Sequence, residues 1–317
     1  MRIAWLFPGQ GSQEVGMGRS VAERFASARD VFARADAAVA AADPSAPAIS
    51  KLCFEGPDDA LTLTANTQPA LVATSSAIVA AIREAHPSLP APVVALGHSL
   101  GEYSALVASG ALRLEDAVRV CRARGQAMQA AVPPGEGSMA AVLGADDETI
   151  AAACAEAATV GLVAPANFNA PGQTVIAGSA PAVARAAEIL GSRGGKVIPL
   201  KVSAPFHCAL MKPAALAMEK ALASVEIAEP AFPVIANVDA EPNADPARVR
   251  GLLVGQVDAP VQWVRSIRRA AEIGVDVALE IGPGKVLAGL VKRIDKRIRV
   301  VSVSDAKAIE ELASLVG

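Results

Sequence analysis

The sequence predicts an α/β fold in which a mainly parallel sheet with helices on both faces is interrupted by a ferredoxin-like subdomain of order βαββαβ. Short apolar runs alternate with helix-like segments up to residue 131 and again after residue 200. Between these parts the alternation gives way to two consecutive strand-like runs. Hydrophobic residues form 52% of the 317-residue chain and aromatic residues only 3%, so the core is mainly aliphatic.

The main domain is expected to comprise residues 1–131 and 200–317. Its predicted strands are residues 2–7, 93–96, 233–237, 276–280 and 299–302. Its predicted helices are residues 21–42, 67–84, 102–109, 115–131, 247–256, 262–272 and 286–294. A proline-rich connector, residues 87–92, precedes the second of these strands.

The inserted subdomain is expected to comprise residues 132–199. Its predicted strands are residues 138–143, 162–167, 174–178 and 196–202, and its predicted helices are residues 146–158 and 181–192. Pro133-Pro134-Gly135 and Pro205 flank the segment and are typical of a domain border.

Charge and cysteine usage exclude several classes of protein. The formal net charge is −3, and a nucleic-acid-binding protein would normally be strongly basic. The four cysteines are far apart and form no CxxC pair, which argues against a zinc site or a thioredoxin-like motif; they are Cys53, Cys121, Cys154 and Cys208. We expect buried thiols in a reducing cytosol.

The N-terminal apolar run is too short for a signal peptide and ends in a glycine-rich turn. Charged residues interrupt the alanine-rich stretches before they reach the ~18 apolar residues of a membrane span. We therefore expect a cytoplasmic protein without membrane contact, and a monomer.

Residues 93–106, VVALGHSLGEYSAL, combine an apolar strand, a GxSxG turn and a helix. This arrangement is the nucleophile elbow, which exposes the serine hydroxyl on a sharp turn. Gly97 and Gly101 fit it because a Cβ at either position would clash with the neighbouring strand and helix. Ser99 is therefore the predicted nucleophile.

A serine needs a base, which is usually histidine at neutral pH, and the chain has three histidines. His86 lies in the proline-rich connector and is expected to be solvated. His98 adjoins Ser99 on a tight turn, so its side chain should point elsewhere. His207 follows the predicted strand 196–202, and catalytic groups collect at the C-terminal ends of strands in parallel sheets. Elimination therefore favours His207.

Two backbone turns are candidates for binding an oxyanion. In a nucleophile elbow the first donor is the N–H after the serine, here that of Leu100. A second could come from the glycine-rich turn at residues 7–13, FPGQGSQ. That turn lacks the GxxxxGK[ST] pattern of a phosphate-binding loop, so nucleotide binding is not predicted.

Several further motifs occur in order along the chain. They are FPGQGSQ at 7–13, GHSLGEYSAL at 97–106, RGQAMQ at 124–129, NFN at 167–169 followed by PGQ, PFHCALM at 205–211, PVQW at 260–263 and GPGKVL at 282–287. Together they resemble the malonyl-CoA:acyl carrier protein transacylase family of fatty acid synthesis over about residues 3–294. The resemblance implies an α/β-hydrolase-like core with a ferredoxin-like insert.

The resemblance also implies residue roles. It makes Ser99 the nucleophile, His207 the base, Gln10 and Leu100 the oxyanion donors through their N–H groups, Arg124 the partner of the malonyl carboxylate, and Gln256 the residue whose backbone carbonyl orients the histidine. No triad acid is needed, because the family uses a Ser–His dyad.

Periodicity alone does not select the arginine. On the helix 115–131, Arg119 lies opposite the apolar stripe, whereas Arg122 and Arg124 flank the stripe on its two sides. Only the resemblance favours Arg124, whose planar guanidinium suits a carboxylate. Phe206 is a further specificity candidate, because a phenylalanine there accompanies malonyl preference in related polyketide acyltransferases.

The implied reaction is ping-pong transfer of malonyl from malonyl-CoA to the phosphopantetheine thiol of acyl carrier protein, without metal or bound cofactor. Because such carriers are acidic, a basic cluster near the C-terminus is a candidate docking surface; it comprises Lys285, Lys292, Arg293, Lys296, Arg297 and Arg299. Alternatives are a polyketide-synthase acyltransferase acting in trans, the malonyltransferase subunit of malonate decarboxylase, an acyl-thioester hydrolase, and a catalytically silent docking module.

Overall fold

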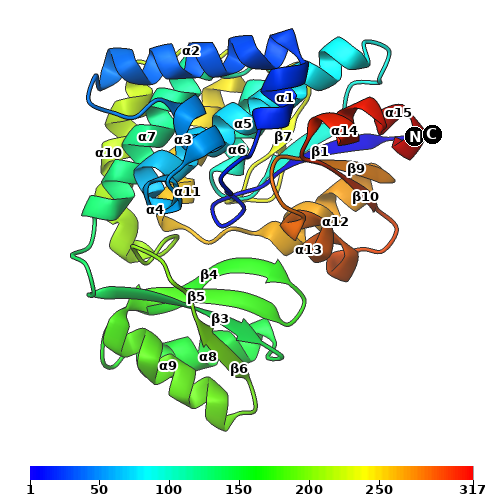
Figure 1. Ribbon diagram of the computed structural model, residues 1–317. Coiled ribbons are helices and arrows are strands. Elements are labelled where there is room, and N and C mark those ends of the chain that lie inside the picture. Colours follow the sequence, from blue (N-terminus) through cyan, green and yellow to red (C-terminus); the bar gives the residue numbers. More distant parts are fainter. Residues whose placement is uncertain (317) are drawn as a thin grey trace.

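The computed structural model describes residues 1–316, which form a large body around a six-stranded sheet and a smaller unit around a four-stranded sheet (Figure 1). The fold is α/β, as the alternation of strands and helices predicts. The first and the last described residues lie on the large body, far from the smaller unit (Figure 1).

The six-stranded sheet, sheet A, has the order β10-β9-β1-β2-β7-β8. Its strands are β1 (Ile3–Phe7), β2 (Val94–Gly97), β7 (Val234–Ile235), β8 (Pro242–Asn243), β9 (Val277–Ile281) and β10 (Arg299–Val303). All neighbouring pairs are parallel except β7 with β8. Every residue of β1, β2 and β9 is buried, as expected for parallel strands covered on both faces.

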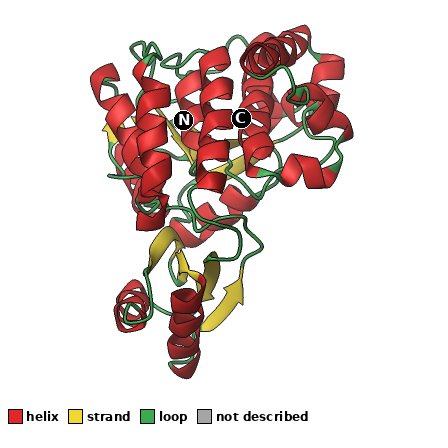
Figure 2. Ribbon diagram, turned by 90° about the vertical axis from the view of Figure 1, so that its left-hand side faces the viewer, coloured by secondary structure: helices red, strands yellow, loops and turns green. Residues whose placement is uncertain are grey.

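The alternation of side chains along β1 divides the core into two layers. Ile3, Trp5 and Phe7 belong to the larger core, which lies under most of the helices. Ala4 and Leu6 face the opposite layer, where they belong to one cluster with residues of α12 (Trp263–Ile273) and α13 (Val286–Ile294). Sheet A is therefore a central layer between helices (Figure 2).

Apart from α1 and α2, the other helices of the large body have bounds close to the predicted ones where a prediction was made. They are α1 (Arg19–Arg24), α2 (Ala26–Ala42), α3 (Ile49–Glu55), α4 (Asp58–Thr62), α5 (Thr64–Ala85), α6 (Gly101–Ala108), α7 (Leu114–Ala130), α10 (Lys212–Ala223), α11 (Pro246–Asp258), α14 (Ala306–Glu310) and α15 (Leu312–Val316). No element was predicted for the segments that form α3, α4, α10, α14 and α15.

The single helix predicted for residues 21–42 is wrong, because the structure has two helices there. Phe25 adopts an extended backbone, with φ −114° and ψ 130°, between α1 and α2. Its side chain is buried in the main core. The sequence carries no glycine or proline at this point, so the apolar periodicity continues through a break that tertiary packing imposes.

The smaller sheet, sheet B, is antiparallel and has the order β4-β5-β3-β6. Its chain order is β3 (Gly137–Leu143), α8 (Asp147–Ala157), β4 (Val163–Ala170), β5 (Gln173–Ser179), α9 (Ala180–Ser192) and β6 (Lys196–Pro199). This is the predicted βαββαβ pattern, and α8 and α9 share a separate apolar core with it. The exact domain bounds, 132 and 199, stay a prediction.

Sheet B is joined to the large body through β4 as well as through the chain connections. The Phe168 N–H donates to the Val261 carbonyl at 3.0 Å, and the Val261 N–H donates to the Ala166 carbonyl at 2.9 Å. The segment before α12 therefore extends the edge of sheet B. The close approach of sheet B to sheet A creates the space described below.

Among residues 1–316, no helix combines the length and the hydrophobicity that crossing a membrane requires.

Candidate active site

The serine predicted as nucleophile lies directly after β2, at the carboxyl edge of sheet A. Ser99 has φ 53°, in the left-handed region that non-glycine residues seldom adopt. A Cβ on Gly97 would lie 1.9 Å from the Gly101 carbonyl carbon, and one on Gly101 would lie 2.3 Å from the Phe7 carbonyl oxygen. The glycines flanking the serine are thus required by close backbone approach, as the elbow motif predicts.

Asn237, which follows β7, holds the elbow in place. Its Oδ1 accepts a hydrogen bond of 2.7 Å from the Ser99 N–H, and its Nδ2 donates one of 2.7 Å to the Gly97 carbonyl. The amide of Asn237 thus bonds to both sides of the strained turn and offsets part of the free-energy cost of its backbone conformation. Sequence analysis did not single out Asn237, because it lies 138 positions from Ser99.

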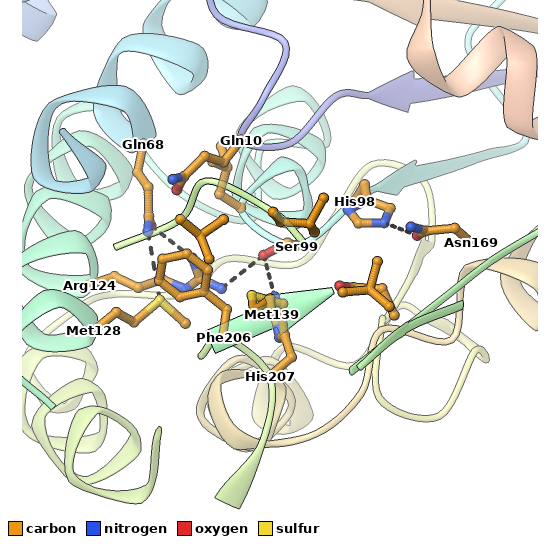
Figure 3. Close-up of a pocket in the computed structure, with 15 residues that line it drawn as sticks. Gln10, Gln68, His98, Ser99, Arg124, Met128, Met139, Asn169, Phe206 and His207 are labelled. Atoms are coloured by element: carbon orange, nitrogen blue, oxygen red, sulfur yellow. Dashed lines mark hydrogen bonds between the residues drawn. The ribbon is translucent and has the colours of Figure 1, made fainter. Parts of the chain in front are cut away.

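His207 contacts the serine. Its Nε2 lies 2.7 Å from Ser99 Oγ (Figure 3). Its Nδ1 lies 2.9 Å from the backbone oxygen of Gln256. A carbonyl oxygen can only accept, so Nδ1 carries the proton and Nε2 is free to take one from the serine. His207 itself has φ 61° and is 4% exposed, so its position is fixed by its surroundings.

The sequence analysis favoured His207 partly because the strand before it was assumed to belong to the parallel sheet, and this assumption was wrong. The strand before it, β6, ends at Pro199 and is an edge strand of the antiparallel sheet B. His207 instead lies on the connection that returns from sheet B to α10. It reaches the edge of sheet A because this connection passes between the two sheets.

Burial, and after it the positive charge of Arg124, lowers the pKa of His207 to about 3. The imidazole is therefore neutral at pH 7, as a proton acceptor must be. Arg124 donates to Ser99 Oγ at 3.2 Å, so the hydroxyl lies between a base and a cation.

The other two histidines do not contact the serine. His98 points away from Ser99, as expected: its Nε2 lies 2.8 Å from Asn169 Oδ1 on sheet B, and burial lowers its pKa. His86 was expected to be solvated, and this was wrong. It is half-buried, and its Nε2 lies 2.6 Å from the backbone oxygen of Ile309.

The structure distinguishes the three arginines of α7. Arg124 is 1% exposed and donates to Gln68 Oε1 and Gln256 Oε1, each at 2.8 Å. Arg122 pairs with Asp43, and Arg119 pairs with Asp116 on the surface. Only Arg124 extends to the serine.

The burial of Arg124 follows from the close packing of α7 against the start of α5. A Cβ on Gly125 would lie 2.6 Å from the Thr64 carbonyl oxygen, so a side chain there would force the helices apart. This contact between helices is distant in sequence, which is why periodicity left Arg122 and Arg124 equivalent.

These groups line a pocket of about 200 Å³ between the two sheets (Figure 3). Its polar lining includes Ser99, His207 and Arg124, and its apolar lining includes Met128, Met139 and Phe206. Met139 lies on β3 of sheet B, so both sheets contribute to the pocket. Phe206 is buried and lies next to the catalytic candidates, as its place in the sequence requires.

Gln10 and Leu100 also line this pocket. Among the described residues, neither backbone N–H donates to a carbonyl group, so both are available to an acceptor inside the pocket. The side chain of Gln10 is bound elsewhere, since its Nε2 donates to Thr64 Oγ1 at 3.2 Å.

Comparison with known proteins identifies the family. The sequence matches the acyl transferase domain family over residues 4–313. It is 45% identical to the malonyl CoA-acyl carrier protein transacylase of Bacillus subtilis, over 98% of this chain and 95% of the relative. This chain belongs to the malonyl-CoA:acyl carrier protein transacylase family. As a transacylase, it is an acyltransferase enzyme.

Solved structures of transacylases have the same fold. The crystal structure of an acyl carrier protein S-malonyltransferase from Vibrio cholerae superposes with a TM-score of 0.94 at 43% identity, covering 98% of this chain and all of that one. A malonyl-transacylase in complex with its type II polyketide synthase acyl-carrier protein superposes with a TM-score of 0.94 at 41% identity, covering 99% of this chain and all of that one. The α/β-hydrolase-like core with its insert is therefore the transacylase fold.

Proposed function

We propose that this transacylase moves a malonyl group from malonyl-CoA to the phosphopantetheine thiol of acyl carrier protein through a malonyl ester on Ser99. One observation carries the proposal: the Ser99 hydroxyl lies between the neutral imidazole of His207 and the buried guanidinium of Arg124, inside a pocket. An activated serine supports acyl transfer, and the cation selects an acyl group that bears a carboxylate.

In the first half-reaction Ser99 Oγ attacks the thioester carbonyl of malonyl-CoA while His207 Nε2 takes the hydroxyl proton. The negative charge on the carbonyl oxygen is stabilised by the N–H groups of Gln10 and Leu100. The carbon–sulfur bond then breaks, and His207 returns its proton to the CoA thiolate. The products are free CoA and the malonyl ester of Ser99.

Arg124 has donor capacity for the malonyl carboxylate. Its contacts with described residues are to amide and hydroxyl oxygens, so its charge is not neutralised by a directly bonded carboxylate. Its Nε is buried and has no partner among the described residues. A carboxylate beside this guanidinium would gain charge-assisted hydrogen bonds in a site of low dielectric constant.

In the second half-reaction the thiol of the carrier protein takes the place of CoA and gives its proton to His207 while its sulfur attacks the ester carbonyl. The bond between that carbonyl carbon and Ser99 Oγ then breaks, and His207 returns the proton to Ser99 Oγ. The proposal requires no metal or bound cofactor, because the chain's own groups supply the nucleophile, the base and the oxyanion donors. It includes the residue roles predicted from the sequence, Gln256 as the residue orienting His207, a monomeric state and a cytoplasmic location.

The decisive experiment measures the malonyl adduct by intact-protein mass spectrometry after mixing with malonyl-CoA. The wild type should carry one malonyl group and Ser99→Ala none. Arg124→Ala should slow malonyl loading by about 10²-fold, since it removes a buried charged hydrogen-bonding partner, while loading from acetyl-CoA is spared. A malonyl adduct on Ser99→Ala would overturn the assignment of the nucleophile.

Transfer to the carrier can be tested in the same assay. The adduct on the wild type should disappear when a phosphopantetheinylated carrier protein is added, and more slowly in buffer alone. Carriers from fatty acid synthesis and from a type II polyketide synthase should be compared, because one structural relative was solved with the latter. Equal loss of the adduct with and without a carrier would favour a hydrolase.

A further inference from the structure

A buried carboxylate that the proposed reaction does not use lies beneath the nucleophile elbow. Glu102 occupies the first turn of α6, three residues after Ser99, and is 2% exposed. Its Oε2 accepts hydrogen bonds from the Asn237 N–H at 2.9 Å and from Gln256 Nε2 at 2.7 Å. Both donors are amide groups, so Glu102 is held without a directly bonded cation.

The side chain of Gln256 connects Glu102 to Arg124. Its Oε1 accepts from Arg124 Nη2 at 2.8 Å, while its Nε2 donates to Glu102 Oε2 and, at 3.0 Å, to the Ser99 carbonyl. Sequence analysis gave Gln256 a role only through its backbone oxygen, so this use of its side chain was missed.

The orientation of that amide has chemical consequences. A glutamine amide turned by 180° has nearly the same shape but exchanges its donor and acceptor. After such a turn Gln256 Nε2 would face the donor Nη2 of Arg124, and Oε1 would face two acceptors. Glu102 and the Ser99 carbonyl are the two acceptors that prevent this turn.

We propose that Glu102 is a positioning residue that fixes the amide orientation of Gln256 and thereby holds Arg124 where it can bind the carboxylate of the acyl group. The inference rests on the proposed function and adds a residue to it. Glu102 acts through two other side chains and touches neither the substrate nor the reacting atoms.

In this proposal an acceptor oxygen of Glu102, rather than its negative charge, holds the amide of Gln256. Burial raises the pKa of Glu102 more than the amide donors and the charge of Arg124 lower it, and the resulting pKa is about 7. A proton on Oε1 would leave Oε2 as an acceptor for both amides, so either protonation state can hold Gln256. A glutamine at position 102 can present the same acceptor, whereas a methionine of similar length cannot.

The test compares Glu102→Gln and Glu102→Met in two single-turnover assays. The first is malonylation by malonyl-CoA, which depends on Arg124. The second is sulfonylation of Ser99 by methanesulfonyl fluoride, a neutral reagent that has no carboxylate for Arg124 to bind and reports on the serine, its base and the oxyanion donors. Thermal melting of each variant identifies any that fails to fold.

Glu102→Met should slow malonylation by about tenfold or more, the equivalent of one hydrogen bond to a charged group, and should change sulfonylation by less than about threefold. Glu102→Gln should stay within about threefold of the wild type in both assays. Glu102→Leu also removes the acceptor oxygen and leaves Gln256 in place, so it should reproduce the selective loss if Glu102→Met does not fold.

Three results would overturn the proposal. They are unchanged malonylation in a folded Glu102→Met or Glu102→Leu protein, equal loss in both assays, and a Glu102→Gln defect as large as that of Glu102→Met. Failure of the proposed function has a different signature, because the wild type itself would then carry no malonyl group on Ser99.

Discussion

Sheet A and sheet B both border the pocket, but different groups of each sheet reach it. The carboxyl edge of sheet A borders the pocket, because β2 ends at Gly97 and the elbow with Ser99 follows directly. Sheet B borders the pocket with one of its faces, since Met139 on β3 and Val175 on β5 line the pocket. Sheet A thus supplies the backbone turns and the serine, whereas sheet B supplies apolar walls and, from β4, the amide side chains of Asn167 and Asn169.

The difference follows from strand direction. All parallel strands end at the same edge, so their following turns converge and can bring N–H groups and a nucleophile together. In an antiparallel sheet the turns alternate between edges, and what remains to face a neighbour is a surface of side chains. The residues between the sheets, Phe206 and His207, belong to both parts of the pocket.

The largest expected effect comes from the polar side. His207→Gln should lower the rate of malonyl loading by about 10²- to 10⁴-fold, because a general base is lost while the size of the side chain is nearly kept. Rapid-quench measurement of the Ser99 adduct checks this. A decrease in the loading rate of less than threefold would show that Ser99 reacts without His207 as its base.

The pH dependence of malonyl loading by the wild type also tests the role of His207 as the base. Because burial and Arg124 hold the pKa of His207 near 3, well below its usual 6.5, the imidazole stays unprotonated as the pH falls below 6.5. The kcat/KM of malonyl loading should therefore show no loss centred near pH 6.5, and the loss from protonation of this base should appear only at more acidic pH. Arg124→Ala should move this loss to higher pH.

A smaller effect is expected from the apolar side. Phe206→Ser should raise the ratio of methylmalonyl to malonyl loading by about tenfold, since one methyl group in an apolar pocket changes binding by about 1–3 kcal/mol. Competition between the two CoA esters, read by mass spectrometry, measures the ratio. An unchanged ratio would mean that the sheet B side alone shapes this part of the pocket.

The smallest effect is expected at the proposed docking surface. The whole basic cluster is exposed, but Arg293 donates to the carbonyl of Pro171 at the turn of sheet B, and Arg297 pairs with Asp295. Reversing the charge of Arg293 or Arg297 would also remove these contacts, so Lys292→Glu is the variant to test. It should raise the KM for the acidic carrier by about two- to fivefold at low salt, because rim charges mainly affect encounter.

Lys220→Glu on α10 is the matched control, since this helix lies on the opposite side of the large body from α13 (Figure 1). Equal KM values for both variants would remove the basic cluster from the docking surface. Loading from malonyl-CoA should be followed in parallel, because only the step with the carrier protein involves this surface in the proposal.

The sequence by itself determined those features that depend on neighbouring residues. The elbow was predictable because strand, glycine, serine, glycine and helix adjoin, and their local sterics allow few alternatives. The βαββαβ order of the insert was predictable from periodicity in the same way.

Only the tertiary structure decided features that depend on distant segments meeting. It buried Arg124 rather than Arg122, because α7 approaches α5 at Gly125. It placed His207 at the serine by the route of the connection from sheet B, and it brought Asn237, Glu102 and Gln256 together under the elbow. Local patterns limit the conformation of each segment, whereas the pairing of polar groups depends on which segments come within hydrogen-bond distance after packing.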